Sequence, residues 1–245
     1  MPRKAQTESL ADTDAAPGGA AAVDRALSLL AAFQPGDKAL SLAILAERTR
    51  LYKSTVLRLL ASLEHGGFIQ RLADHRYAIG PEIARLHALY AASFSLESVV
   101  VPALQALVAA TGESAAYHVR QGDRRLCLYR VDSPHPVRDH IRAGDLLPLD
   151  RGTGGRILWA FAGEGMGPAP ATPEDAALLD TIRAQGYFAT LGDRLPGVAG
   201  ISAPVFRADG RLAGAVTLTM PVERYRPEYL GPVLAAAQRL GRQVG

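Results

Sequence analysis

The sequence predicts an α+β protein of two domains, and three observations carry this prediction. The chain has 245 residues, which is more than one small module needs and suits two domains of ordinary size. Helical periodicity dominates the first third, whereas strand-like runs dominate beyond residue 112. Hydrophobic residues make up 48% of the chain and charged residues 21%, which excludes the collagen-like, coiled-coil and wholly disordered classes.

The first 80 residues predict an arm followed by a small helical domain. Residues 1–20 are rich in Ala, Asp, Gly and Pro and have no hydrophobic period, which predicts a disordered arm. Apolar spacing predicts helices over 23–33, from 42 to a turn at 50–51, and over 52–64, followed by short strands at 68–71 and 76–79. Three helices and a two-stranded hairpin have the sequence shape of a winged helix-turn-helix, which we place at 21–80.

The remainder predicts a linker helix at 81–95 and a second domain at 96–245. That domain is expected to hold one antiparallel sheet with helices packed on it. Its expected helices are 96–110, 152–161, 174–185 and 227–242, and its expected strands are 115–120, 125–131, 137–142, 200–206 and 212–220. Ala208-Asp209-Gly210 is a hairpin-turn signal between the last two strands.

Charge and cysteine content narrow the function class only slightly. The formal net charge of +3 is compatible with nucleic-acid binding but does not argue for it. Cys127 is the single cysteine, which excludes an internal disulfide and a cysteine-rich zinc site and favours a reducing, cytoplasmic location. We expect neither a membrane span nor a signal peptide, because no apolar run of the necessary length occurs.

Short motifs follow one another in a characteristic order from residue 20 to the end. They are the runs Ala22–Leu30, Ser41–Arg48, Lys53–Leu63, Arg76–Pro81, Val131–Pro136, Gly144 with Leu147–Leu149, Gly186–Tyr187 and Pro196–Val205. No single motif is decisive, but the ordered set resembles the IclR family of bacterial transcription regulators. The resemblance implies a DNA-binding domain, a linker helix used in dimerisation and a GAF-like effector-binding domain.

The resemblance also implies partners. These are double-stranded operator DNA, a small organic effector, and a second copy of the chain in a homodimer or a dimer of dimers; no cofactor and no membrane is implied. The chain departs from the family at three places. Asp150–Arg156 replace a common His-Ala-Thr-Ala-Leu-Gly-Lys run, Gly200 replaces a frequent Cys, and Thr190 replaces a frequent acidic residue. These departures suggest an effector different from the familiar ones.

The third helix carries the candidate DNA-reading surface. Lys53, Ser54, Leu57 and Arg58 fall opposite its apolar stripe, as a recognition helix requires. On pattern alone, a merely solvated basic face is about as good an explanation, and the resemblance favours DNA. The expected DNA-binding residues are Arg25, Arg50, Lys53, Ser54, Thr55, Leu57, Arg58, Arg71 and Arg76.

A glycine-rich stretch, Arg151–Gly155, directly precedes a predicted helix. Backbone N–H groups at a helix start bind anions, which favours a small carboxylate effector, although a tight turn without any ligand would also need glycine. The resemblance favours a site formed by Asp139, Thr153, Gly154, Gly155, Thr190, Gly200, Thr217 and Thr219. Asp139 is the weaker candidate, because it could instead pair with Arg138 or Arg142 at the surface.

Catalysis has little support in the sequence. No nucleophile elbow, P-loop or His-Glu-x-x-His run is present, and Cys127 is expected to be a buried, inert thiol. His135 and His140 lie near two aspartates, but the Pro-His-Pro context favours a rigid turn over a metal site. We therefore expect a ligand-responsive transcription regulator and no enzyme. The alternatives are a small-molecule-binding protein or enzyme with an accessory winged helix, and a constitutive DNA-binding protein with a degenerate sensor.

Overall fold

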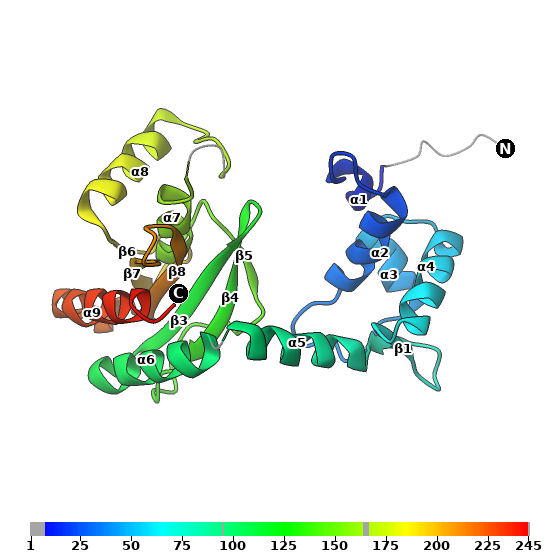
Figure 1. Cartoon of the computed structure of the whole chain (residues 1–245), viewed down its shortest axis with the longest axis horizontal. Coiled ribbons are helices and arrows are strands. Elements are labelled where there is room, and N and C mark those ends of the chain that lie inside the picture. The colour runs from blue at the N-terminus through cyan, green and yellow to red at the C-terminus, as the bar shows by residue number, and fades with distance from the viewer. Residues whose placement is uncertain (1–7, 95, 164–166, 245) are drawn as a thin grey trace. The chain divides into compact units, whose positions relative to one another are not determined.

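The computed structural model describes residues 8–94, 96–163 and 167–244, and the chain divides into two compact units (Figure 1). The first unit is Met1–Ser93 and the second is Phe94–Gly245. Each unit has its own hydrophobic core. Within the described residues, no helix is long and apolar enough to cross a membrane.

The first unit is a winged helix-turn-helix, as predicted. Its elements are α2 (Ala21–Ala31), α3 (Leu42–Thr49), α4 (Lys53–His65), the antiparallel pair β1 (Ile69–Arg71) and β2 (Tyr77–Ile79), and α5 (Pro81–Phe94). The Ser41 hydroxyl accepts a hydrogen bond from the Ile44 amide and caps α3. Arg50 takes the left-handed conformation at φ 56° and turns the chain between α3 and α4.

The N-terminal arm differs from the expectation of disorder over its described part. Leu10–Thr13 form a single helical turn, α1, which contacts α2. The Ser9 side chain accepts from the Asp12 amide, and Ala11 is buried. Asp12 also pairs with Arg25 of α2, at 2.8 Å. A capping residue and one ion pair hold this turn in place, and neither produces a hydrophobic period that sequence reading would detect. Residues 1–7 of the expected arm lie outside the described residues.

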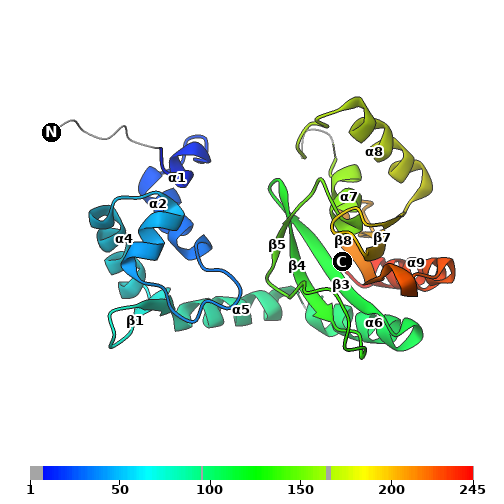
Figure 2. The same ribbon diagram turned by 180° about the vertical axis from the view of Figure 1, so that it is seen from behind.

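The second unit is built on a six-stranded antiparallel sheet with helices on both faces (Figures 1 and 2). The strand order is β5-β4-β3-β8-β7-β6. The strands are β3 (Ser114–Gln121), β4 (Arg124–Val131), β5 (Leu146–Pro148), β6 (Phe188–Leu191), β7 (Val198–Phe206) and β8 (Leu212–Pro221). Helices α6 (Leu96–Thr111) and α9 (Leu230–Gly241) pack on one face, and α7 (Thr153–Ala160), backed by α8 (Pro173–Gln185), packs on the other. Two 3₁₀ turns, Val222–Arg224 and Pro227–Tyr229, precede α9.

Alternation along the strands gives the two faces of this sheet different chemistry. On β8, Val216 and Leu218 enter the large core beneath α6 and α9. The intervening Thr217 and Thr219 point to the α7 face and are nevertheless buried. A buried hydroxyl face under a short helix is where a polar site can form.

Two differences from the predicted elements lie at the sheet edges. Residues 137–142 form no strand; the side chain of Asp139 there is buried among arginines instead. The short strands β5 and β6, which the sequence did not indicate, are the two edge strands of the sheet. β5 and β6 have three and four residues, and neither shows the pair of strand-like runs around a short turn that predicted β1 and β2.

Candidate functional site

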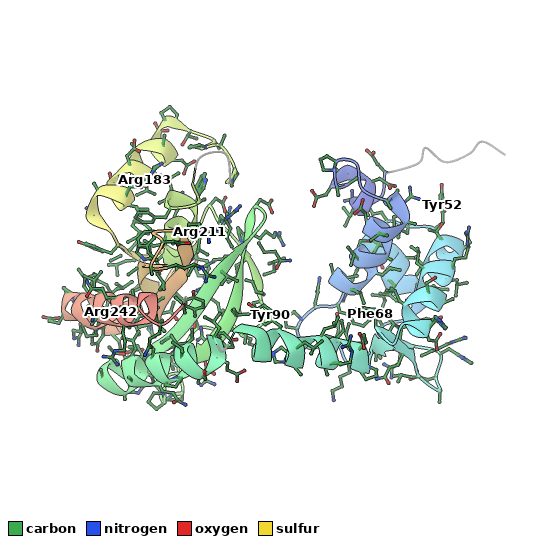
Figure 3. The ribbon with its side chains drawn as sticks, in the orientation of Figure 1. Tyr52, Phe68, Tyr90, Arg183, Arg211 and Arg242 are labelled. Carbon is green, nitrogen blue, oxygen red and sulfur yellow. The ribbon has the colours of Figure 1, made fainter. Side chains whose placement is uncertain are left out.

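The start of α4 presents an exposed polar surface. Lys53, Ser54, Leu57 and Arg58 are exposed, whereas Val56 on the opposite face is buried. Tyr52 stands at the N-cap position, 62% exposed, and no side chain caps the helix. Figure 3 shows this tyrosine at the outer end of the helix. The first amides of α4 are therefore available to a phosphate, as at other anion-binding helix starts.

The basic residues expected to bind DNA fall into two groups. Arg50, Lys53 and Arg58 are exposed and form no ion pair with any described residue, and Thr55 beside them is half-buried. The others have partners within their own domain, since Arg25 pairs with Asp12, Arg76 pairs with Asp74 at 2.7 Å, and Arg71 lies over the Tyr77 ring. Because Arg71 and Arg76 are exposed and Arg25 is only half-buried, a phosphate can compete for these side chains.

A small cavity of about 20 Å³ lies between the first turn of α7 and the sheet. Five residues expected to bind the effector line it, namely Thr153, Thr190, Gly200, Thr217 and Thr219. Arg125, Ile141, Gly152, Asp193, Arg194, Val198 and Ala199 complete the lining. The structure thus brings most of the expected effector residues together, from four separate elements.

A chain of buried hydroxyls joins α7 to the sheet beside this cavity. The Ser202 hydroxyl lies 2.8 Å from Thr153 Oγ1 and 2.8 Å from Thr217 Oγ1. All three side chains are buried. Sequence reading missed Ser202, because a lone serine in an apolar strand carries no signal of its own; its alternation with Ile201 and Ala203 was the only available hint.

Gly154 and Gly155, at the start of α7, have different structural roles. A Cβ at Gly154 would lie 2.6 Å from Thr217 Oγ1, so this glycine permits the helix to approach the polar face. A Cβ at Gly155 would instead meet the Leu149 carbonyl oxygen at 2.6 Å, away from the cavity. Neither glycine lines the cavity, and the Gly152 amide already donates to the Asp193 carboxylate. The first helix donor is therefore occupied by a protein carboxylate.

Asp139 is not at the surface, and its partners are not Arg138 or Arg142. Its side chain is fully buried and pairs with Arg130 and with Arg194, the latter at 3.3 Å. Thr219 Oγ1 donates to the same carboxylate at 3.3 Å. Asp139 thus orders one wall behind the cavity, which it does not itself line.

Two buried polar side chains beneath α7 were not among the expected residues. Arg125 of β4 is 2% exposed, and its Nε has no hydrogen-bond partner among the described residues. Burial, followed by the charge of Arg194, lowers the pKa of Arg125 to about 10. His118 of β3 is fully buried, and neither ring nitrogen has a described partner. Burial, followed by the charge of Arg125, holds the pKa of His118 well below its ordinary value, so the ring is neutral.

Cys127 lies on the same face of β4 as Arg125 and is buried, as expected. Burial raises the pKa of its thiol to about 12. A thiol in this environment is protonated at neutral pH and is a poor nucleophile. Among the described residues, no group of three His, Cys, Asp or Glu side chains is arranged to hold a metal ion.

Comparison with known proteins decides the family. A family model described as the IclR helix-turn-helix domain matches residues 22–73, and one described as the bacterial transcriptional regulator IclR C-terminal matches residues 172–245. A solved IclR-family regulator from Rhodococcus sp. is 30% identical, covers 93% of this chain and 94% of its own, and superposes with a TM-score of 0.55. The chain belongs to the IclR family.

Other IclR-family relatives match over nearly the whole chain. The glycerol operon regulatory protein of Streptomyces coelicolor is 27% identical over 243 residues, which is 91% of this chain and 96% of that protein. The structure of an IclR homologue from Microbacterium hydrocarbonoxydans, complexed with 4-hydroxybenzoate, is 20% identical and covers 90% of this chain and 97% of its own with a TM-score of 0.77. The chain is therefore a transcriptional regulator of the IclR family, and the predicted α+β architecture is confirmed.

Proposed function

We propose that this regulator is ligand-responsive, and that a small organic acid binds beneath α7 and alters its affinity for operator DNA. The observation that carries the proposal is the cavity at the α7 start, which is lined by Thr153, Thr190 and Thr217 among other residues. Buried polar groups in a folded core are normally satisfied by protein partners, and several converging on one cavity mark a binding site. The relative complexed with 4-hydroxybenzoate supports an acid as the ligand class.

DNA is bound through α4 and the wing in this proposal. The N-terminal half of α4 enters the major groove, where Ser54, Leu57 and Arg58 reach base edges. Lys53 and the free amides of the first turn contact phosphates. Arg50, Thr55, Arg25, Arg71 and Arg76 supply further contacts to the backbone of the duplex.

The regulator acts as a homodimer in this proposal, so that it can bind an operator made of two half-sites. Helix α5 leaves Leu86, Leu89 and Tyr90 between 39% and 51% exposed. Three large apolar side chains at helical spacing expose more apolar surface than a solvent-facing helix usually does. We therefore place the dimer contact on this helix. Two copies then present two recognition helices to two half-sites.

The size of the response is limited by thermodynamics. A ligand shifts operator affinity only by its difference in affinity between the DNA-binding form and the other form of the dimer. An acid that binds both forms equally occupies the cavity without any regulatory effect. This limit makes ligand binding and operator response separate measurements.

Fluorescence anisotropy of operator DNA tests the proposal. The probe is duplex DNA from the region upstream of the gene for this regulator and of its neighbours, titrated with the full-length protein at low salt. A panel of aliphatic and aromatic carboxylic acids is then added. We expect specific binding and a change in apparent affinity with at least one acid. The proposal fails if no duplex is bound, or if acids that demonstrably bind the protein never change its affinity for DNA.

A further inference from the structure

A second and much larger cavity lies on the α7 face of the sheet, at the opposite end of that helix. Its volume is about 460 Å³, compared with about 20 Å³ for the cavity at the start of α7. Cavities that hold small molecules measure roughly 300–1,000 Å³. The two cavities have no lining residue in common, so the larger one is a separate space.

The larger cavity exists because α7 is shorter than the strands that it covers. The helix has eight residues and is about 12 Å long, whereas β7 and β8 have nine and ten residues and are about 30 Å long. Its first turn lies over Thr217, near the middle of β8, and Phe161 directly after its last turn reaches Phe206 at the end of β7. The part of this face next to the β7–β8 turn is therefore left uncovered by α7.

Apolar side chains form much of the cavity wall. The rings of Phe161 and Phe206 meet edge to face, with their centroids 5.3 Å apart. A β-bulge after Val205 pairs Phe206 with Leu212, and Leu212 packs against the core beneath α7. Bulges of this kind redirect side chains and are common beside binding sites. Phe206 nevertheless remains 38% exposed, so a large apolar surface faces the cavity.

The rim of the same cavity carries positive charge. Arg211 lines it with a side chain that is 81% exposed and that pairs with Asp209 at 2.7 Å. Arg120 of β3 also lines it, is half-buried, and donates through Nη1 to the Gly122 carbonyl oxygen at 2.8 Å. One carboxylate neutralises at most one of these two guanidinium groups. A net positive charge therefore borders an apolar wall, which favours a ligand with an apolar body and an anionic group.

We propose that this cavity is a second ligand site, and that it binds an amphiphilic anion. The apolar body packs on Phe161, Phe206 and Leu212, and the anionic group lies at Arg120 and Arg211. About 460 Å³ corresponds to about fifteen water-sized groups of about 30 Å³ each, which suits a molecule of about ten to fifteen non-hydrogen atoms. The site goes beyond the proposed function, because its ligand is additional to the acid that binds at the start of α7.

Isothermal titration calorimetry of the full-length protein tests this site. The anionic probes are octanoate and 2-naphthoate, and the neutral and cationic counterparts are octan-1-ol and octyltrimethylammonium. We expect at least one of the two acids to bind in a saturable manner. The alcohol and the ammonium should bind at least about fivefold more weakly, because two exposed arginines each contribute about two- to fivefold to the affinity for an anion.

Substitutions of the lining residues locate the bound acid. Phe206→Asp replaces an apolar wall with a carboxylate and should weaken binding of the acid by at least about tenfold. Arg120→Met and Arg211→Met should each weaken it by about two- to fivefold. If circular dichroism shows that Phe206→Asp does not fold, the two arginine variants decide the result.

Two matched variants in the same unit control for changes at the surface. Leu191→Asp places a carboxylate at another apolar position of the sheet, 59% exposed on β6. Arg183→Met removes an exposed arginine of α8 that pairs with Asp180 just as Arg211 pairs with Asp209 (Figure 3). Both variants should bind the acid like the wild type.

Three results would overturn the assignment of this second site. The first is that neither acid binds in a saturable manner. The second is that the alcohol or the ammonium binds as tightly as the acids. The third is that the acid binds with wild-type affinity to folded Phe206→Asp or, where that variant does not fold, to both arginine variants.

A variant in the small cavity keeps this proposal distinct from the proposed function. Thr190→Val changes a residue that lines only the cavity at the start of α7, so it should leave the affinity for octanoate and 2-naphthoate unchanged. If Thr190→Val weakens binding and Phe206→Asp does not, the acid lies at the start of α7. The second site is then wrong, and the proposed function stands.

Discussion

The Ser202 hydroxyl of β7 lies 2.8 Å from Thr153 Oγ1, at the first residue of α7, so that a single side chain joins the sheet to the helix above the cavity. The same oxygen lies 2.8 Å from Thr217 Oγ1 on β8. Ser202 is fully buried, and it therefore acts as a hydrogen-bonded link where most strands would place an apolar side chain.

Replacement of this link should destabilise the second unit. Ser202→Ala leaves two buried threonine hydroxyls without their shared partner, which costs about 1–3 kcal/mol in the free energy of unfolding. Urea unfolding followed by the fluorescence of Trp159 measures the change. The control is Thr181→Ala on α8, where an exposed hydroxyl bonds only to its own helix and the loss should be negligible. Equal stability of Ser202→Ala and the wild type would show that the hydroxyl chain has no energetic role.

Arg58 should discriminate between operator and random DNA. If it reads a base edge, Arg58→Ala reduces operator affinity by about 1–3 kcal/mol and has a smaller effect on random DNA. Anisotropy titrations at several salt concentrations give both values. Arg239→Ala on α9, an exposed arginine in the other unit, is the matched control. An equal loss on both DNAs would assign Arg58 to a phosphate.

Charged residues on α5 should separate the dimer. Leu86→Glu together with Leu89→Glu places two carboxylates on the exposed apolar surface of that helix, and burying them against a partner would be strongly unfavourable. Light scattering coupled to size-exclusion chromatography should then report a folded monomer. Val137→Glu, at a position 66% exposed in the second unit, should leave the oligomeric state unchanged. A dimer that survives the double substitution would place the interface elsewhere.

The stability of the second unit should fall below pH 6.5 because of His118. Burial holds the pKa of this ring well below its ordinary value of 6.5. Below pH 6.5, His118 therefore becomes protonated in the unfolded chain but stays neutral in the folded chain. The free energy of unfolding therefore decreases as pH falls through this window, by up to about 1.4 kcal/mol per pH unit. Urea titrations at several pH values measure the slope. His118→Gln should flatten it, whereas His87→Gln on α5 should not; the same slope in all three proteins would contradict the assignment.

The sequence predicted the DNA-binding unit well and the effector pocket only in part. An amphipathic helix such as α4 carries its period within 13 residues, so both its apolar stripe and its exposed Lys53 and Arg58 could be read directly. The threonines of β8 were predicted from alternation and resemblance, and the structure places them at the cavity.

Arg125 and Ser202 were missed for a physical reason. Their role depends on burial by α7, a helix that follows β4 by more than 20 residues and precedes β7 by more than 35, and no local pattern records that packing. A strand with charges on one face looks solvent-exposed in isolation. Arg125 could have been suspected only because its neighbour on the same face, Cys127, was already expected to be buried.

Helix α7 cannot move closer to the sheet at its first turn, because Gly154 and Gly155 already bring its backbone against side-chain and carbonyl oxygens. A ligand that displaces this first turn would move a helix that is about 12 Å long. The far end of that helix carries Trp159, the single tryptophan of the chain, whose indole N–H donates to the Pro168 carbonyl at 2.7 Å. Displacement of the first turn would change the surroundings of this one fluorophore, so we expect the emission of Trp159 to report any ligand that moves the helix.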